Sequence, residues 1–125
     1  MNTLVQATRF VARLLIVIQI ILGFLIWFGD TSLVQVHIVL GGLFVLNLWV
    51  LGLIALFALE KRTLPLFALF MGGAILWFGV AQRALLVGSA HWAVRVLHLL
   101  LGLAAMGLTE ALSKAVLAHR KALSS

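Results

Sequence analysis

The chain lacks cysteine and carries little charge. No cysteine occurs among its 125 residues, which excludes disulfides, thiolate catalysis, iron–sulfur clusters, thioether-attached haem and cysteine-based zinc sites. Charged residues make up 10 %, less than half of the roughly 25 % found in soluble domains. Only three residues are acidic, and the first three apolar runs contain none. Proton-coupled export, which needs a carboxylate deep in a membrane helix, is therefore disfavoured.

Apolar residues are abundant in place of charge. They make up 65 % of the chain, against roughly 45–50 % in soluble domains. A soluble fold of this size has too little interior to bury them, so the composition predicts an integral membrane protein. The net charge of +6 comes from few, scattered basic residues. It is interpreted as a topology signal and as affinity for anionic membrane lipid, and no nucleic-acid partner is expected.

The charged residues divide the chain into four apolar spans. These run near 10–29, 33–58, 64–86 and 91–113, and a basic C-terminal tail follows over 114–125. Each span has about 20 residues or more, enough to cross a hydrocarbon core of ~30 Å. The short linkers make consecutive helices antiparallel neighbours. The sequence thus predicts one all-α domain over 1–125, an integral membrane four-helix up-down bundle.

Basic residues predict the orientation of the bundle. Seven of nine fall at the end that holds both termini and the 60–63 turn, and only Arg83 and Arg95 fall at the other. The excess of Lys and Arg marks the cytoplasmic side, so both termini are expected to be cytoplasmic, in a bacterial inner membrane. Trp27, Trp77 and Trp92 near the outward ends are typical of an aromatic belt.

The two halves of the chain resemble each other. Residues 24–29 match residues 74–79 at an offset of 50, and residues 37–41 match residues 98–102 at an offset of 61. The first and third helices run in one direction and the second and fourth in the other. We therefore expect a parallel two-helix internal repeat, related by an axis along the membrane normal.

Two histidines lie inside the apolar spans, His37 in the second and His98 in the fourth. An ionisable residue within a membrane helix is costly and indicates a functional site. Both helices run inward from one face, and their rise of about 1.5 Å per residue puts both histidines roughly 6–10 Å deep. The second and fourth helices of such a bundle are diagonal partners, so the imidazoles are expected to face each other. This arrangement is typical of bis-histidine haem ligation, with both residues as metal ligands.

Further residues near the pair suit a haem site. Gly41 and Gly102 each follow a histidine by four positions, on the same helix face, and leave room for a flat macrocycle to approach the backbone. The remaining candidates, for packing at the edge of the macrocycle or pairing with its propionates, are Phe28, Phe78, Arg95 and Arg83.

Other roles for buried polar residues stay open. Histidine, glutamine and asparagine also form hydrogen bonds between membrane helices, and a histidine pair can serve a metal ion or a proton pathway. We interpret Gln19 and Asn47 as interhelical hydrogen-bonding residues. Glu110 and Lys114, four residues apart, predict an ion pair within the last helix.

With its histidines on the second and fourth helices near the outer face, the chain resembles one four-helix half of the heme A synthases. It is also similar to bis-histidine b-type membrane cytochromes. The resemblance covers nearly the whole chain in topology. In that family a glutamate lies one turn before a ligating histidine and an arginine directly follows it, whereas Leu33 and Ile38 flank His37 here. The resemblance therefore implies the scaffold and haem ligation by His37 and His98, and not haem-modifying chemistry.

These observations favour a small b-type cytochrome. It would hold one haem b and pass single electrons near the outer face, to or from a quinone or a larger redox complex; whether it is an enzyme stays open. The alternative is a haem-free helical subunit that packs against a larger complex. A homodimer is also expected, through small residues of the third and fourth helices: Ala68, Gly72, Ala81, Gly107 and Ala111.

Overall fold

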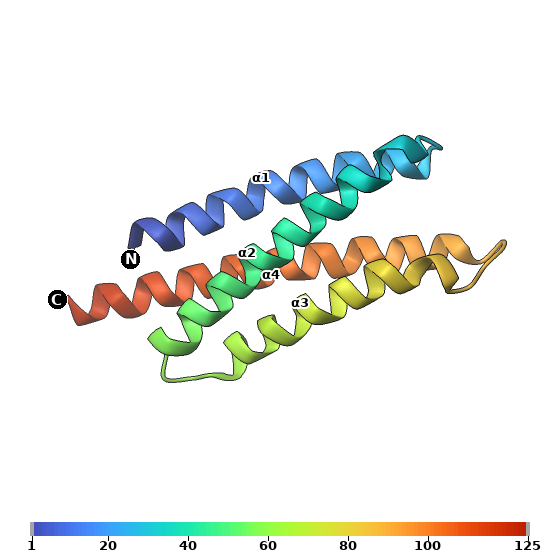
Figure 1. Ribbon diagram of the computed structural model, residues 1–125. Coiled ribbons are helices and arrows are strands. Elements are labelled where there is room, and N and C mark those ends of the chain that lie inside the picture. Colours follow the sequence, from blue (N-terminus) through green and yellow to red (C-terminus); the bar gives the residue numbers. More distant parts are fainter. Residues whose placement is uncertain (1, 125) are drawn as a thin grey trace.

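A computed structural model describes residues 2–124 of the chain. The fold is a four-helix bundle (Figure 1). In chain order its elements are α1 (Asn2–Trp27), a 3-10 turn η1 (Thr31–Leu33), α2 (Val34–Ala58), α3 (Thr63–Ala81), a 3-10 turn η2 (Gln82–Ala84) and α4 (His91–Leu123). The helices run up, down, up and down. Both chain ends and the α2–α3 turn lie at one end of the bundle, which we name the terminal end, and the α1–α2 and α3–α4 turns lie at the other, the histidine end.

Helices α2 and α4 pack against each other across the middle of the bundle. Each also packs against both α1 and α3, whereas within residues 2–124 α1 and α3 do not contact one another. This confirms the diagonal pairing of the second and fourth helices. At the histidine end the two hairpin turns spread apart (Figure 1).

The helices differ from the expected spans mainly at the terminal end. Helix α1 starts at Asn2 instead of near 10, and α4 continues to Leu123, so most of the basic tail is helical. Apolar run length does not detect these turns because they mix polar residues with good helix formers. Their packing faces are buried nonetheless, since Val5 and Val116 are fully buried. At the other end, α3 stops at Ala81, five residues early.

A glycine ends α1. The amide of Gly29 donates to the carbonyl of Ile26, and that of Asp30 donates to Leu25, each at 3.1 Å. These two bonds form a Schellman motif, which places Gly29 at φ 116°, in the left-handed region that favours glycine. The Asp30 carboxylate then accepts from the backbone N–H of Ser32 at 3.2 Å, which starts η1.

The core lies in the terminal half of the bundle. Its largest fully buried side chains include Leu48, Leu51, Leu112, Val5 and Val116, which come from α1, α2 and α4. By contrast, Val94 is the only buried residue in the segments 20–43 and 79–104. Packing density is therefore uneven along the bundle axis.

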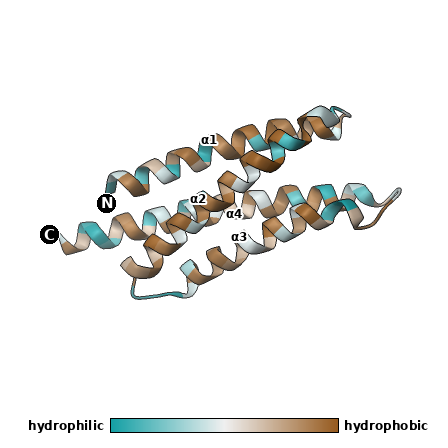
Figure 2. Ribbon diagram, viewed as in Figure 1, coloured by the Kyte–Doolittle hydropathy of each residue, from teal (hydrophilic) through white to brown (hydrophobic). Residues whose placement is uncertain are grey.

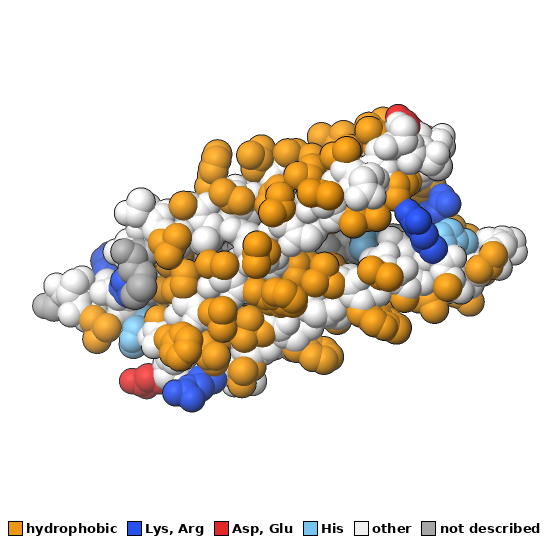
Figure 3. Space-filling view, viewed as in Figure 1, with side chains coloured by type: hydrophobic (Ala, Val, Ile, Leu, Met, Phe, Trp, Pro, Cys, Tyr) orange, Lys and Arg blue, Asp and Glu red, His pale blue; other side chains and the backbone are white. Residues whose placement is uncertain are grey.

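Most of the outer surface is apolar. Each helix is long and apolar enough to span a membrane, and only 17–33 % of the most apolar window of each is buried within the bundle. Hydrophilic residues gather towards the two ends in Figure 2, and orange hydrophobic side chains cover most of the face seen in Figure 3. This is the pattern of an integral membrane protein, whose apolar exterior faces lipid.

An ion network joins α1 to α4 at the terminal end. The Glu110 carboxylate accepts from Arg9 Nε at 2.8 Å and from Arg13 Nε at 2.6 Å. The predicted Glu110–Lys114 pair is wrong: among residues 2–124 both ion pairs of Glu110 are with α1. The two arginines come from a neighbouring helix, which sequence spacing does not reveal.

Small residues proposed for a homodimer contact are partly buried inside the chain's own bundle. Ala68 is fully buried, and Gly72 makes room for Trp49, whose Nε1 would lie 2.3 Å from a Cβ at that position. The same indole donates to the Leu69 carbonyl at 3.0 Å. These α3 positions therefore serve packing between α2 and α3, whereas Gly107 of α4 is exposed.

Candidate cofactor site

The two intramembrane histidines lie opposite each other. His37 is in the first turn of α2 and His98 in the second turn of α4, and their ring centroids are 6.1 Å apart with the ring planes inclined by 55°. Both are half-buried. In Figure 3 a histidine side chain is visible in a hollow between the two hairpins, near the histidine end. The expected approach of the pair is thus present in the structure.

Neither imidazole forms a hydrogen bond within residues 2–124. The Nδ1 atoms of His37 and His98 are both buried and unpartnered. Buried polar atoms are normally paired, so each orphan needs an explanation. Simple interhelical hydrogen bonding by the imidazoles does not supply one.

Gln19 and Asn47 do form interhelical hydrogen bonds, as expected. Gln19 Nε2 donates to the His37 carbonyl at 2.8 Å, and Asn47 Nδ2 donates to the Thr8 carbonyl at 2.9 Å. Both bonds join α1 to α2. The Gln19 side chain is 8 % exposed. Its Nε2 holds the backbone of His37, whereas its Oε1 is buried without a partner.

The glycines beside the imidazoles are not the ones that the sequence indicates. A Cβ at Gly23 of α1 would lie 3.7 Å from His37 Cε1, and one at Gly79 of α3 would lie 3.6 Å from His98 Cε1. Gly41 instead faces Gln19 Nε2, at 2.9 Å from such a Cβ, and Gly102 faces α1. Each histidine therefore packs against a glycine of the preceding helix.

The two aromatic candidates lie in different surroundings. Phe78 is 9 % exposed and stacks on His98, with centroids 6.0 Å apart and planes inclined by 12°. Phe28 is 85 % exposed, just beyond α1, and within residues 2–124 its ring contacts neither histidine ring. Phe78 thus holds the orientation of one imidazole, whereas Phe28 faces outward.

The two arginine candidates lie towards the surface at the histidine end. The Arg95 guanidinium is 5.8 Å from the centroid of the Trp27 ring, a cation–π contact between α4 and α1. Arg83 is exposed in η2. His91 is held by its own hairpin, since its Nδ1 lies 3.1 Å from the Leu85 carbonyl oxygen. Within residues 2–124, none of these three residues forms a hydrogen bond or ring contact with His37 or His98.

The histidine pair fits a metal with two axial imidazole ligands. A metal–imidazole bond is about 2 Å long, so two such bonds in line put the ring centres roughly 6 Å apart, as found here. Within residues 2–124 no group of three His, Cys, Asp or Glu side chains could hold a metal ion. A bare ion needs three or four protein ligands, whereas haem brings four nitrogens and needs only the axial two. The donor set therefore suits haem better than a bare ion.

Sequence reasoning missed three neighbours of the pair. Gly79 ends the repeated segment 74–79. Gly23 lies directly before the matching segment 24–29, and the offset of 50 aligns it with Gly73, which has nothing within 4 Å of an added Cβ. Gln19 lies near the histidine end by chain position, and its bond to the His37 backbone depends on the α1–α2 crossing. The repeated glycines were the available signal, and only packing tells which of them face the site.

No family model, no curated protein and no solved structure matches the chain.

Proposed function

We propose that the chain is a small b-type cytochrome in which His37 and His98 are the axial ligands of one haem b. One observation carries this proposal: two imidazoles from diagonal helices face each other at 6.1 Å, and both have buried Nδ1 atoms without a partner. Metal ligation would give each of these otherwise unpartnered imidazoles a role that hydrogen bonding does not supply. When bound, such a haem supplies single-electron transfer with no open coordination position.

The chain's own residues orient the ligands. Gln19 donates to the backbone of the first turn of α2 and fixes the position of His37. Phe78 stacks on the His98 ring and limits its rotation. Because Gly23 and Gly79 have no side chain, α1 and α3 can pack closely against the imidazoles. The edges of a macrocycle between α2 and α4 would lie beside these two glycines.

We also propose that Arg95 and Arg83 pair with the propionates of the haem. Arg95 and Arg83 lie at the histidine end, closer to the surface than the histidines, where outward-pointing carboxylates would find them. Arg95 is held over Trp27. We propose that an external redox partner, a quinone or a larger complex, meets the protein at this end.

The orientation proposed is that of a bacterial inner-membrane protein with both termini in the cytoplasm. Its support is the uneven charge, since the terminal end carries seven of nine basic residues: Arg9, Arg13, Lys61, Arg62, Lys114, Arg120 and Lys121. The histidine end, and the haem, then lie towards the outer face.

We further propose that the two hairpins form a parallel repeat, like one half of a heme A synthase. In support, each hairpin sets a glycine of its first helix against the histidine of its second. The lengths differ, because His37 follows Gly23 by 14 positions and His98 follows Gly79 by 19. The longer α3–α4 connection takes up the difference.

An absorption spectrum of protein purified from haem-replete cells tests this function. We expect a Soret band, visible bands that sharpen and split on reduction, and a potentiometric titration with one electron per haem. A colourless preparation that is folded and monodisperse would instead support the haem-free helical subunit.

A further inference from the structure

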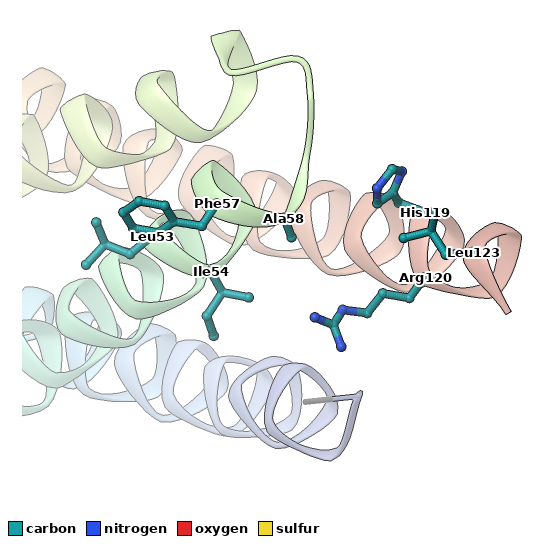
Figure 4. Close-up of a pocket in the computed structure, with 7 residues that line it drawn as sticks. All are labelled: Leu53, Ile54, Phe57, Ala58, His119, Arg120 and Leu123. Carbon is teal, nitrogen blue, oxygen red and sulfur yellow. The ribbon is translucent and has the colours of Figure 1, made fainter.

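A groove of about 500 Å³ lies at the terminal end, far from the histidines along the bundle axis (Figure 4). Its apolar wall is the end of α2, with Leu53, Ile54 and Phe57, and its other side is the end of α4, with His119, Arg120 and Leu123. Its volume lies within the roughly 300–1,000 Å³ of small-molecule sites. The groove is therefore large enough for part of an amphipathic molecule.

The apolar wall of the groove is open. Phe57 is 87 % exposed and Leu123 is 76 % exposed, so both present apolar surface at the mouth. Helix α4 continues to Leu123 alongside the end of α2. The wall of the groove on α2 therefore belongs to an apolar span, whereas the wall on α4 belongs to the basic last turns of that helix. The α2 side suits the hydrocarbon interior of a membrane, and the α4 side suits the membrane–water interface.

The cationic side of the groove lacks a counter-ion. Arg120 Nε is buried and has no hydrogen-bond partner, and neither ion pair within residues 2–124 includes this arginine. In Figure 4 the Arg120 side chain extends from α4 towards Ile54, while His119 points to the other side of α4. No acidic residue lines the groove. A cation without a partner beside an apolar wall is complementary to an anion with an apolar tail.

We infer that this groove binds an anionic phospholipid, with its phosphate on Arg120 and its first acyl carbons against the apolar wall on α2. Basic pockets at the cytoplasmic ends of membrane helices commonly hold anionic headgroups, and most basic residues of this chain gather at the same end. A charge-assisted bond to Arg120 favours a phospholipid with net negative charge over a zwitterionic one. This inference does not depend on haem.

Native mass spectrometry of delipidated protein in mild detergent tests this inference. The protein is titrated with phosphatidylglycerol and phosphatidylcholine that have identical acyl chains. We expect about tenfold tighter retention of phosphatidylglycerol, and loss of most of that preference in Arg120→Gln, as for one charge-assisted hydrogen bond. Lys121→Gln is the matched control: it removes the same charge from the next residue, which is exposed and does not line the groove, and it should keep the preference within about twofold.

Several results would overturn the inference. Equal losses in Arg120→Gln and Lys121→Gln would mean general surface charge, and displacement of the lipid by inorganic phosphate would mean that a free anion suffices. A lipid-free dimer of the wild type, broken by Phe57→Ser, would mean that a second copy covers the groove. Should Arg120→Gln fail to fold by circular dichroism, Arg120→Lys takes its place, and it is expected to weaken retention of phosphatidylglycerol while the control does not.

Discussion

The two ends of the bundle are built differently. At the terminal end Leu48, Leu51 and Leu112 are fully buried, and Glu110 ties α1 to α4 through two arginines. At the histidine end the hairpin turns spread apart, Val94 is the only buried residue in the segments 20–43 and 79–104, and the Nδ1 atoms of both intramembrane histidines are unpartnered.

This difference separates stability from function. The packed apolar side chains and the Glu110 network lie at the terminal end, so that end supplies the packing that holds the four helices together. At the histidine end, buried imidazole nitrogens without hydrogen-bond partners cost stability locally, which is expected where a site serves a ligand. Substitutions at the two ends should therefore affect different measurements.

The largest effect is expected from the histidines. His37→Ala and His98→Ala should each abolish low-spin haem, because either change removes one of two axial ligands. His91→Ala and His119→Ala are the controls, since His91 bonds its own hairpin and His119 lies at the terminal end. The reduced absorption spectrum of each purified variant gives the answer, and a normal spectrum in His98→Ala would show that the ligands are assigned wrongly.

The next largest effect is expected on stability, from a substitution in the packed terminal half of the bundle. Leu112→Ala should lower the free energy of unfolding by about 2–5 kcal/mol, because it opens a cavity in the packed half. Unfolding in mixed detergent and sodium dodecyl sulfate micelles measures it. Leu100→Ala, at a 55 % exposed position of the same helix, should change little. A haem spectrum altered by Leu112→Ala as strongly as by a ligand variant would contradict the separation of the two ends.

A smaller effect is expected at the glycine beside His98. Gly79→Leu should weaken haem binding about tenfold, since a side chain there overpacks against the imidazole by roughly 1–3 kcal/mol. Gly73→Leu, on the same helix with open space around it, is the control. Haem titrations of both variants decide the matter, and equal affinities would mean that Gly79 only serves helix packing.

The smallest effect concerns the ion network. Glu110→Gln should cost about 1 kcal/mol of stability, less at high salt, because the pairs are partly exposed and screened. Glu60→Gln, in the exposed α2–α3 turn, should cost less than this. Unfolding midpoints at low and high ionic strength provide the test; a loss of several kcal/mol, independent of salt, would point to a buried and essential network.

The sequence predicts the helices and their order well, because long apolar runs interrupted by charge are unambiguous at membrane length. It also predicts the facing of His37 and His98, since depth and diagonal pairing follow from short turns. The ends of α1 and α4 were not predicted, because mixed polar turns become helical by packing, as at Val5 and Val116. Glu110 pairs with residues about 100 positions away, which local spacing cannot show.

A haem titration of the purified protein, prepared free of haem, tests whether His37 and His98 together hold a haem. We expect saturation at one haem per chain with the absorption bands of a low-spin iron, and no such bands when His98→Ala is titrated in the same way. Saturation that leaves the bands high-spin, or the same low-spin bands in His98→Ala, would contradict the claim that the two facing histidines hold the haem between them.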